Sequence, residues 1–381
     1  MLSPYALSRP GGVQGQVLGL SRALRTLGHE VTVIAPDERR DLTAHGADEV
    51  FVSGRPTGLR SNGSVAPVTI SPLAARRAER FVRRGGFDVV HLHEPLAPLA
   101  SYAIALRAAL PMVGTYHRAG VSRWVPPFKP LLKLIGSRLG VRVAVSEAAR
   151  QTAVTSNGGE YEVLFNGIAM ERFAEAPPVR DPEGRPTLLF LGRHETRKGL
   201  SVLLDAFAAL EGPAVLWVAG DGPAGEVQRR RHPASDRVQW LGLLSDDEVA
   251  ARLAGADVLC APSLRGESFG MVVLEGMAAR CAVVASDLEG YRAAAGGHAA
   301  LVAPGDIGAL ARALGVALAD VREGSGQSAP EALTAALEHA GAWSMDALAQ
   351  RYVEVYQRAI ERFGSTSPRA GSCTRDAPAR R

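Results

Sequence analysis

Cysteine and long apolar runs are the scarcest features of this sequence. The three cysteines, Cys260, Cys281 and Cys373, are scattered over 381 residues, which excludes a disulfide scaffold and favours a reducing compartment. Cys260 and Cys281 stand among apolar residues and are expected to be small buried side chains. No apolar run approaches the roughly 20 residues of a membrane-spanning helix, and the first residues do not resemble a secretory leader. We therefore expect a cytoplasmic protein.

Charge is unevenly distributed along the chain. Residues 1–168 carry 20 Lys and Arg against 12 Asp and Glu, whereas residues 169–381 carry 23 against 27. The basic first half predicts contact with an anionic partner. No nucleic-acid motif or aromatic stacking pattern accompanies this charge, so nucleic acid is not the expected partner. The composition, with 46 % hydrophobic and 22 % charged residues, is typical of a globular protein. A chain of 381 residues is long enough for two domains.

Short apolar runs alternate with helical patterns, which predicts an α/β fold with parallel sheets. In the first half the expected strands are residues 31–35, 89–93, 112–116 and 141–145. In the second half they are residues 187–191, 215–219, 238–241, 258–261, 282–285 and 300–302. The helical spacing of Val17, Leu20, Leu24 and Leu27 predicts a helix that stops near Gly28.

The same patterns predict the domain organisation. Residues 1–170 form a first domain, residues 171–186 a linker rich in proline and charge, and residues 187–343 a second domain. A final helix over residues 344–363 is expected to pack back toward the first domain, followed by a disordered tail over residues 364–381.

The beginning of the chain does not fit a doubly wound domain. Such a domain opens with a central strand, yet only Met1, Leu2 and Ser3 precede Pro4 and the first loop. Either the translation start lies upstream, or a short stub takes the place of a core strand. The sequence favours the first alternative.

One stretch points to chemistry: Glu-Ser-Phe-Gly-Met-Val-Val-Leu-Glu, residues 267–275. It follows an expected strand and opens an expected helix, whose free N–H groups and dipole favour a phosphate. Glu267 and Glu275 can accept hydrogen bonds from hydroxyls on either side of that phosphate. This spacing predicts a site for a diphosphate with a sugar at each end. The alternative is a solvent-exposed Glu and a Glu that interacts with the helix dipole.

Three further features lie at the expected strand ends. Gly11 and Gly12 open the first helix, where backbone can approach an anion closely. Cations follow the first strand of the second domain, at Arg193, Arg197 and Lys198, and the sequence Gly220-Asp221-Gly222-Pro223 follows the next strand. Ligands of open α/β sheets bind at the carboxyl ends of the strands, so two such domains predict a cleft between them.

With these motifs the chain resembles the family 4 retaining glycosyltransferases of the GT-B fold, two Rossmann-like domains that face each other across a cleft. Within that family it is most similar to the actinobacterial phosphatidyl-myo-inositol mannosyltransferases. The likeness rests on Pro-Gly-Gly-Val-Gln (10–14), Gly-His-Glu-Val (28–31), Asn-Gly-Ser-Val-Ala (62–66), Phe-Asp-Val-Val-His-Leu-His-Glu-Pro (87–95), Thr-Tyr-His (115–117), Arg-Lys-Gly (197–199), Gly-Glu-Ser-Phe-Gly (266–270) and Val-Val-Ala-Ser-Asp-Leu (283–288).

The resemblance implies roles for individual residues. Catalytic roles fall to His117, Arg193, Lys198 and Glu267. Donor-binding roles fall to Gly12, Arg193, Arg197, Lys198, Leu244, Ser245, Asp246, Glu267, Ser268, Phe269, Gly270, Met271 and Glu275. The acceptor inositol phosphate would meet Gln14, Asn62 and Ser64. The donor implied is GDP-mannose, and neither a catalytic metal nor a cofactor is expected.

Some positions depart from the pattern of this branch. Ser61 and Pro67 replace an aromatic residue and an arginine near the acceptor, Ser122 replaces a lysine, and Val249 replaces a lysine-like residue of the base-binding loop. Donor chemistry is less affected by these changes than acceptor identity.

Each assignment also has a structural alternative. Arg193 and Lys198 would then be surface charges, His117 a structural residue at a strand end, and the glycines 220 and 222 an ordinary turn. His91 and His93 alternate on one expected strand and are interpreted as structural or cleft-lining.

Two basic segments predict contact with a membrane surface. Arg76, Arg77, Arg80, Arg83 and Arg84 fall on one expected helix of the first domain. Residues 118–138 mix cations, among them Arg123, Lys129, Lys133 and Arg138, with Trp124, Val125, Phe128, Leu131, Leu132 and Ile135. Cations interleaved with large apolar residues are typical of a surface for anionic lipid. The alternatives are a solvated helix for the first segment and a buried helix for the second.

Three functions remain open from the sequence. The first is transfer of mannose from GDP-mannose to a phosphatidylinositol-type lipid at the inner face of the cell membrane. The second keeps the fold but uses another nucleotide sugar and a non-lipid or other envelope acceptor. The third is a protein that binds nucleotide sugars without turnover.

Overall fold

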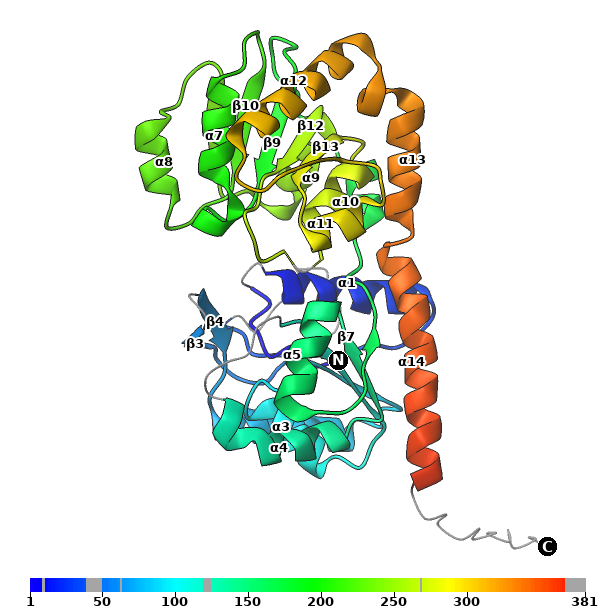
Figure 1. Ribbon diagram of the computed structural model, residues 1–381. Coiled ribbons are helices and arrows are strands. Elements are labelled where there is room, and N and C mark those ends of the chain that lie inside the picture. Colours follow the sequence, from blue (N-terminus) through cyan, green and yellow to red (C-terminus); the bar gives the residue numbers. More distant parts are fainter. Residues whose placement is uncertain (9–10, 39–49, 62–63, 119–124, 268, 367–381) are drawn as a thin grey trace, which may run out of the picture.

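The computed structural model describes residues 1–8, 11–38, 50–61, 64–118, 125–267 and 269–366. The chain forms two α/β halves, stacked one above the other in Figure 1, and each is built on a parallel sheet. This is the predicted fold class.

The second half contains a six-stranded parallel sheet in the order β11-β10-β9-β12-β13-β14, the doubly wound order. All six strands were expected from the sequence. Their bounds are β9 Thr187–Leu191, β10 Val215–Ala219, β11 Val238–Gly242, β12 Val258–Ala261, β13 Ala282–Ser286 and β14 Ala300–Val302.

Both faces of this sheet are buried, which explains why its strands are continuous apolar runs. Leu188 and Phe190 pack in one cluster with α7 (Leu200–Ala208) and α12 (Ile307–Glu323). Leu189 packs on the opposite face, in a cluster with residues of the other helices. Those helices include α9 (Asp246–Gly255), α10 (Met271–Ala278), α11 (Glu289–Ala295) and α13 (Pro330–Gly341). Outside both clusters the half also contains α8 (Gly225–Arg231) and the short 3₁₀ turns η2 (Thr196–Lys198) and η3 (Gly326–Ser328).

The sheet of the first half is completed by the first residues of the chain. Leu2 forms parallel bridges to Ile34 of β1 and to Leu92 of β5. It thereby joins β1 (Val33–Ala35) and β2 (Val50–Val52) to the set β5 (Val90–His93), β6 (Met112–Tyr116), β7 (Val141–Ala144) and β8 (Glu162–Val163). Residues 1–3 thus take the central strand position.

Several elements of the first half differ from expectation. The strands β2 and β8 and the antiparallel hairpin of β3 (Thr57–Ser61) and β4 (Ser64–Val68) were not predicted.

The first helix, α1, runs Gly12–Thr26 and lies on the side of this half that faces the second half (Figure 1). The other helices are α2 (Pro72–Arg84), α3 (Ala100–Arg107), α4 (Val125–Ser137) and α5 (Glu147–Asn157).

The two halves are connected by two segments that lie side by side. Ile168 pairs with Ser344 in a parallel bridge, through Ile168 N–H to Trp343 O (2.9 Å) and Met345 N–H to Ile168 O (2.8 Å). The first segment continues into α6 (Met170–Ala174), and the second into α14 (Met345–Thr366). The helix α14 leaves the second half and packs along the first, beside α1, β6 and β7 (Figure 1).

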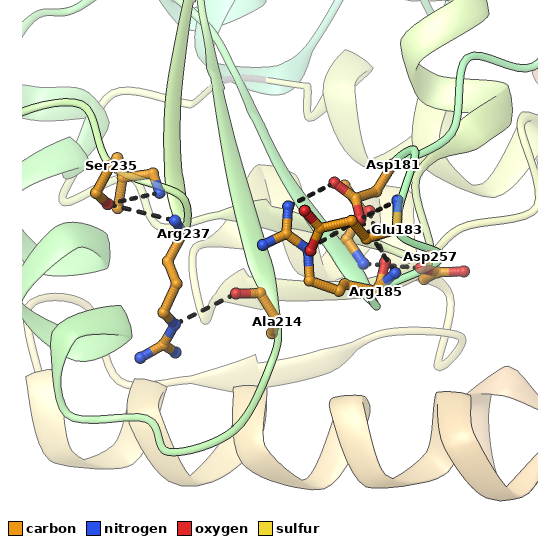
Figure 2. A network of polar contacts seen from close by, with 9 residues as sticks. Asp181, Glu183, Arg185, Ala214, Ser235, Arg237 and Asp257 are labelled. Carbon is orange, nitrogen blue, oxygen red and sulfur yellow. Dashed lines mark hydrogen bonds and ion pairs between the residues drawn. The ribbon is translucent and has the colours of Figure 1, made fainter.

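A polar network fixes the segment before β9 (Figure 2). Asp181 accepts two hydrogen bonds from the Arg185 guanidinium, both 2.9 Å, and Asp257 accepts the Thr187 N–H at 2.8 Å. Arg237 donates to the Ala214 carbonyl. Except for Asp181, these residues stand at or just before the first residue of a strand. The network therefore stabilises the amino-terminal edge of the sheet, opposite the edge where a ligand site is expected.

Candidate functional site

Three cations and two carboxylates form a continuous network at the carboxyl end of β9. The Glu195 carboxylate forms ion pairs with Arg193 Nη2 at 3.1 Å and with Arg197 Nε at 2.8 Å. Glu267 Oε1 forms ion pairs with Arg197 Nη1 at 3.2 Å and with Lys198 Nζ at 2.7 Å. Arg197 therefore bridges the two carboxylates. The five charges leave a net positive charge, as expected for a site that receives a diphosphate.

Backbone geometry brings this network together. Gly199 has a φ of 71°, and a Cβ at this position would collide with the carbonyl oxygen of Pro262. Leu264 N–H donates to Arg197 O at 2.7 Å. Since β9 and β12 are neighbours at the point where the strand order reverses, the turns after both strands meet there.

The Glu267 carboxylate is held by neutral groups as well as by cations. Ser263 Oγ donates to Glu267 Oε1 at 3.0 Å and is itself 2.9 Å from the Tyr291 hydroxyl. Burial, and after it the charge of Glu267, raises the pKa of Tyr291, so its phenol stays neutral and can donate a hydrogen bond. Ser263 and Tyr291 were not identified from the sequence, because their proximity depends on how the 263–270 loop folds onto α11.

The loop before α10 requires glycine. Gly270 has a φ of 85°, and a Cβ there would lie 2.9 Å from both the Ala294 side chain and the Gly290 carbonyl oxygen. Within the described part of the chain, the N–H groups of Met271 and Val272 have no hydrogen-bond partner. Donors of this kind at the positive end of a helix can bind an anion. Phe269 packs on Trp343, with ring centroids 5.2 Å apart, and Ser268 lies outside the described residues.

Glu275 lies in the second turn of α10 and has a different environment. Burial raises the pKa of its carboxyl to about 7. The charge of Arg172 lowers this pKa, whereas the charge of Asp246 raises it further. Arg172, on α6, donates from Nε to the Asp246 carbonyl at 3.1 Å. Glu275 thus lies close to Asp246, in the turn of Leu244, Ser245 and Asp246 that the resemblance implies would bind the base of the donor.

Within that turn the three predicted residues are unequally available. The Ser245 hydroxyl accepts Glu248 N–H at 3.3 Å, and Glu248 Oε2 accepts Ser245 N–H at 2.7 Å, which is a capping box for α9. Ser245 therefore has a structural role in the free protein. Asp246 is exposed, and Leu244 is half-buried against the second-half core.

In the first half, His117 follows β6 beside a second histidine. His117 Nε2 lies 3.0 Å from His93 Nδ1, and His117 N–H donates to Glu94. Burial lowers the pKa of His117 to about 4, so its imidazole is neutral at pH 7. Glu94 has a φ of 48°, a conformation that is rare outside glycine and that aims its carboxylate at the backbone of residues 117 and 118.

His91 is a structural residue, one of the two interpretations given from the sequence. Its Nδ1 lies 2.8 Å from the Tyr356 hydroxyl and its Nε2 lies 2.7 Å from Thr115 Oγ1. Thr115 in turn lies 2.7 Å from the Tyr352 hydroxyl. These bonds tie β5 and β6 to α14, so the helix that crosses from the second half is fixed to the strand that leads to His117.

The residues expected at the acceptor are placed less favourably. Gln14 is 7 % exposed, and its Nε2 donates to the Ala6 carbonyl at 3.3 Å, so its side chain is turned into the protein. At Gly12 an added Cβ would meet open space, whereas at Gly11 it would collide with Gln14. Ser64 lies in β4, but its side chain and all of Asn62 are outside the described residues.

The Gly220–Gly222 turn has a packing role. A Cβ at Gly220 would collide with the Gly192 carbonyl oxygen, and one at Gly222 would lie 2.8 Å from the His194 carbonyl oxygen. The turn therefore lets the end of β10 approach the end of β9, beside Arg193.

Gln16, which the sequence did not single out, binds the connection between the halves. Its Nε2 donates to Gly167 O and its Oε1 accepts Gly167 N–H, both at 2.8 Å. A buried glutamine in α1 thus holds the first connecting segment.

The described residues contain no helix long and apolar enough to cross a membrane. They also contain no group of three or more His, Cys, Asp or Glu side chains arranged to hold a metal ion.

Family models and relatives match almost the whole chain. The model described as Glycosyltransferase Family 4 matches residues 10–172, and the one described as Glycosyl transferases group 1 matches residues 185–320. The phosphatidyl-myo-inositol mannosyltransferase of Mycobacterium tuberculosis (strain ATCC 25618 / H37Rv) is 36 % identical over 375 residues, covering 95 % of this chain and 92 % of the relative. The protein of that name from Mycolicibacterium smegmatis is 38 % identical over 317 residues, covering 81 % and 79 %.

Solved structures share the architecture. Sucrose-phosphate synthase from Thermosynechococcus elongatus superposes with a TM-score of 0.71 at 19 % identity, covering 94 % of this chain and 98 % of that one. Anabaena Alr3699/HepE, solved in complex with UDP and glucose, superposes with a TM-score of 0.70 at 19 % identity, covering 93 % and 98 %. At this identity the likeness establishes the fold alone.

Proposed function

The chain belongs to glycosyltransferase family 4 and has the GT-B fold, and on that premise we propose that it transfers mannose from GDP-mannose to a phosphatidylinositol-type lipid. The observation that carries the donor half of this proposal is the network of Arg193, Arg197 and Lys198 with Glu267, beside the unpaired N–H groups of α10. The acceptor half is supported by the relatives named phosphatidyl-myo-inositol mannosyltransferase, which are similar to this chain over most of their length.

In this proposal, ligand binding redistributes the ion pairs of the free protein. Arg193 and Lys198 form ion pairs with the diphosphate, and Glu267 then accepts hydrogen bonds from the sugar hydroxyls. As the bond between the sugar C1 and the phosphate oxygen breaks, negative charge grows on the leaving diphosphate. Fixed cations stabilise that charge without reorganisation. These cations supply the positive charge that a metal ion would otherwise provide, so we expect no metal requirement.

We propose a retaining, front-side displacement. The acceptor hydroxyl forms its bond to C1 on the face that the diphosphate leaves, and its proton passes to the departing phosphate oxygen. No protein nucleophile is needed. His117, neutral at pH 7, exchanges a hydrogen bond with a donor-sugar hydroxyl rather than contributing a positive charge.

Two surfaces of the first half support action at the inner face of the cell membrane. All five arginines of α2 are exposed: Arg76, Arg77, Arg80, Arg83 and Arg84. On α4, Leu132 and Ile135 are buried, whereas Phe128 is 55 % and Leu134 49 % exposed, next to exposed Lys129 and Lys133. An apolar and basic surface of this kind favours anionic lipid.

A second candidate keeps the donor chemistry and changes the acceptor. It is favoured by Gln14, whose side chain is turned inward and bonded to Ala6 rather than presented to a ligand. A soluble or other envelope sugar would then replace the lipid.

Alanine substitution of Lys198 or Glu267 tests the transfer site. Each should lower kcat by at least about 100-fold, because one preorganised charge interaction with the developing charge is lost. The assay is release of GDP from GDP-mannose in the presence of phosphatidylinositol vesicles, with UDP-glucose and UDP-N-acetylglucosamine as competing donors. Unchanged thermal unfolding would establish that both variants are folded. Retained turnover in both variants would refute the site, and turnover only with a soluble acceptor would favour the second candidate.

A further inference from the structure

Two histidines join the carboxyl ends of β5 and β6, and only His117 has a role in the proposed reaction. His93 Nδ1 lies 3.0 Å from His117 Nε2. In the parallel pairing of the two strands His93 lies opposite Thr115, and His117 follows Thr115 by two residues, which places it on the same face. What His93 does for His117 depends on which of the two nitrogens carries the hydrogen between them.

The ring of His93 is packed in a fixed position. Its side chain belongs to a residue that is 1 % exposed, and its ring centroid lies 4.1 Å from that of His91 and 5.3 Å from that of His117. His91 is itself held by the Tyr356 hydroxyl and by Thr115 Oγ1. Because a buried ring in such packing has no room to turn, Nδ1 of His93 stays directed at His117.

Both imidazoles of this pair are neutral at pH 7. Burial lowers the pKa of His117 to about 4. Burial also lowers the pKa of His93 well below its usual value, and the neighbouring rings of His91 and His117 lower it further. A neutral imidazole has one N–H and one bare nitrogen that accepts. A single hydrogen therefore lies between the two rings, and its position sets the tautomer of both.

The other nitrogen of His93 distinguishes the two arrangements. His93 Nε2 is buried and has no hydrogen-bond partner in the described part of the chain. If His117 Nε2 donated to His93 Nδ1, the hydrogen of His93 would be on this Nε2, as a buried N–H without an acceptor. Such groups are rare and costly, whereas an unused acceptor is tolerated more often. The favoured arrangement thus has the hydrogen on His93 Nδ1.

His117 then carries its own hydrogen on Nδ1. This nitrogen has no hydrogen-bond partner among the described residues, and it is not enclosed by protein, since His117 is only half-buried. The main chain of His117 is fixed as well, because Glu94 accepts its N–H. Two consecutive residues, His93 and Glu94, thus hold the ring and the backbone of His117 and leave its Nδ1–H for a ligand.

We propose that His93 is a positioning residue for the transfer reaction: it donates Nδ1–H to His117 Nε2 and so makes His117 a donor, through Nδ1, to a hydroxyl oxygen of the donor sugar. The proposal rests on the proposed function and deepens it, since it gives the direction of the hydrogen bond between His117 and the sugar. A sugar with hydrogen in place of that hydroxyl would leave the Nδ1–H unpaired.

Nitrogen-15 NMR of the full chain, labelled in its histidine rings, tests the tautomer without any substitution. A ring nitrogen that carries hydrogen and a bare one give well-separated signals, and the spectrum of His117→Ala identifies the signals of His117. At neutral pH we expect hydrogen on His117 Nδ1 and a bare Nε2, and after His93→Leu we expect both tautomers of His117. Hydrogen on His117 Nε2 in the wild type would overturn the proposal.

A double-mutant cycle tests whether His93 acts through His117. Release of GDP from GDP-mannose, in the presence of phosphatidylinositol vesicles, is compared for the wild type, His93→Leu, His117→Ala and the double variant. His93→Leu should lower kcat about tenfold, from the loss of one oriented hydrogen bond, and His93→Asn should recover most of the rate, because its amide nitrogen can take the place of Nδ1. The double variant should be no slower than His117→Ala. Losses that multiply in the double variant would show a merely structural role for His93.

His91→Leu is the matched control. It removes another buried imidazole from the same face of β5, whose bonds run to Thr115 and Tyr356 instead of His117. Thermal unfolding reports the stability of both variants, and only His93→Leu should change the His117 tautomer. The same change after His91→Leu would assign the effect to the packing of the strand and overturn the proposal.

The two experiments also separate this proposal from the proposed function. The NMR spectrum needs no turnover, so a protein with the expected tautomer that transfers no sugar would refute the proposed transfer. Turnover with the opposite tautomer would refute the role of His93 alone.

Discussion

Glu267 and Glu275 stand eight positions apart and have opposite environments. Glu267 accepts bonds from Arg197, Lys198 and Ser263, so its charge is compensated in the free protein. Glu275 is half-buried, and desolvation raises its pKa to about 7. The first residue is suited to exchange partners when a ligand arrives, and the second is suited to respond to pH.

Glu275 should make stability depend on pH. Its folded pKa lies above the unfolded value, so folding takes up a proton between about pH 4.5 and 7, and stability is lost as pH rises through this window. Glu275→Gln should abolish that loss and be more stable than the wild type at pH 8 by about 2 kcal/mol, a value reduced from the full pKa shift because the side chain is partly solvated. Urea unfolding of both proteins from about pH 5 to pH 8 measures the difference. A constant difference across this range would contradict the assignment.

At the residue level the sequence predicts cations and carboxylates better than their partners. Lys198 and Glu267 could be placed together because both follow strands that end at one sheet edge. Glu195 and Ser263 could not, since their contacts depend on the backbone turn at Gly199 and on the fold of the 263–270 loop. The inward direction of Gln14 is likewise set by the loop around Ala6, which has no sequence signal.

Among the elements, buried strands were the most predictable. Continuous apolar runs such as those of β9, β10 and β12 are typical of strands in a sheet that is buried on both faces. The two-residue β8 is exposed and shows no pattern. The hairpin of β3 and β4 did have a signal, Asn62-Gly63 between two runs, but the same residues also matched a family motif and were interpreted as such.

The connection between the halves depends on close approach at Gly167. A Cβ there would lie 2.9 Å from the Met345 Cα, a backbone atom that cannot move away alone. Gly167→Ala should therefore cost about 1–3 kcal/mol, by overpacking, and loosen the Gln16 contact. Gly341→Ala is the matched control, because its Cβ would meet open space at the end of α13. Thermal unfolding compares the two, and equal stability would show that the connecting segments adjust freely.

For the whole molecule, α14 is the element that joins the two halves. Its apolar face and its packing toward the first half were expected from the sequence, and the paired segments at Ile168 and Ser344 set where it begins. His91, Thr115, Tyr352 and Tyr356 then join this helix to the strand that leads to His117. The second half is therefore held to the first through buried polar bonds as well as apolar packing.

The central claim is that the two halves hold a sugar diphosphate and that cations of the second half bind its leaving end. Calorimetry of GDP-mannose with the wild type and with Lys198→Ala tests it most directly. We predict saturable binding to the wild type and at least tenfold weaker binding to the variant, about the contribution of one charge-assisted contact. A folded wild-type protein that gives no heat with GDP-mannose, UDP-glucose or UDP-N-acetylglucosamine would contradict the account.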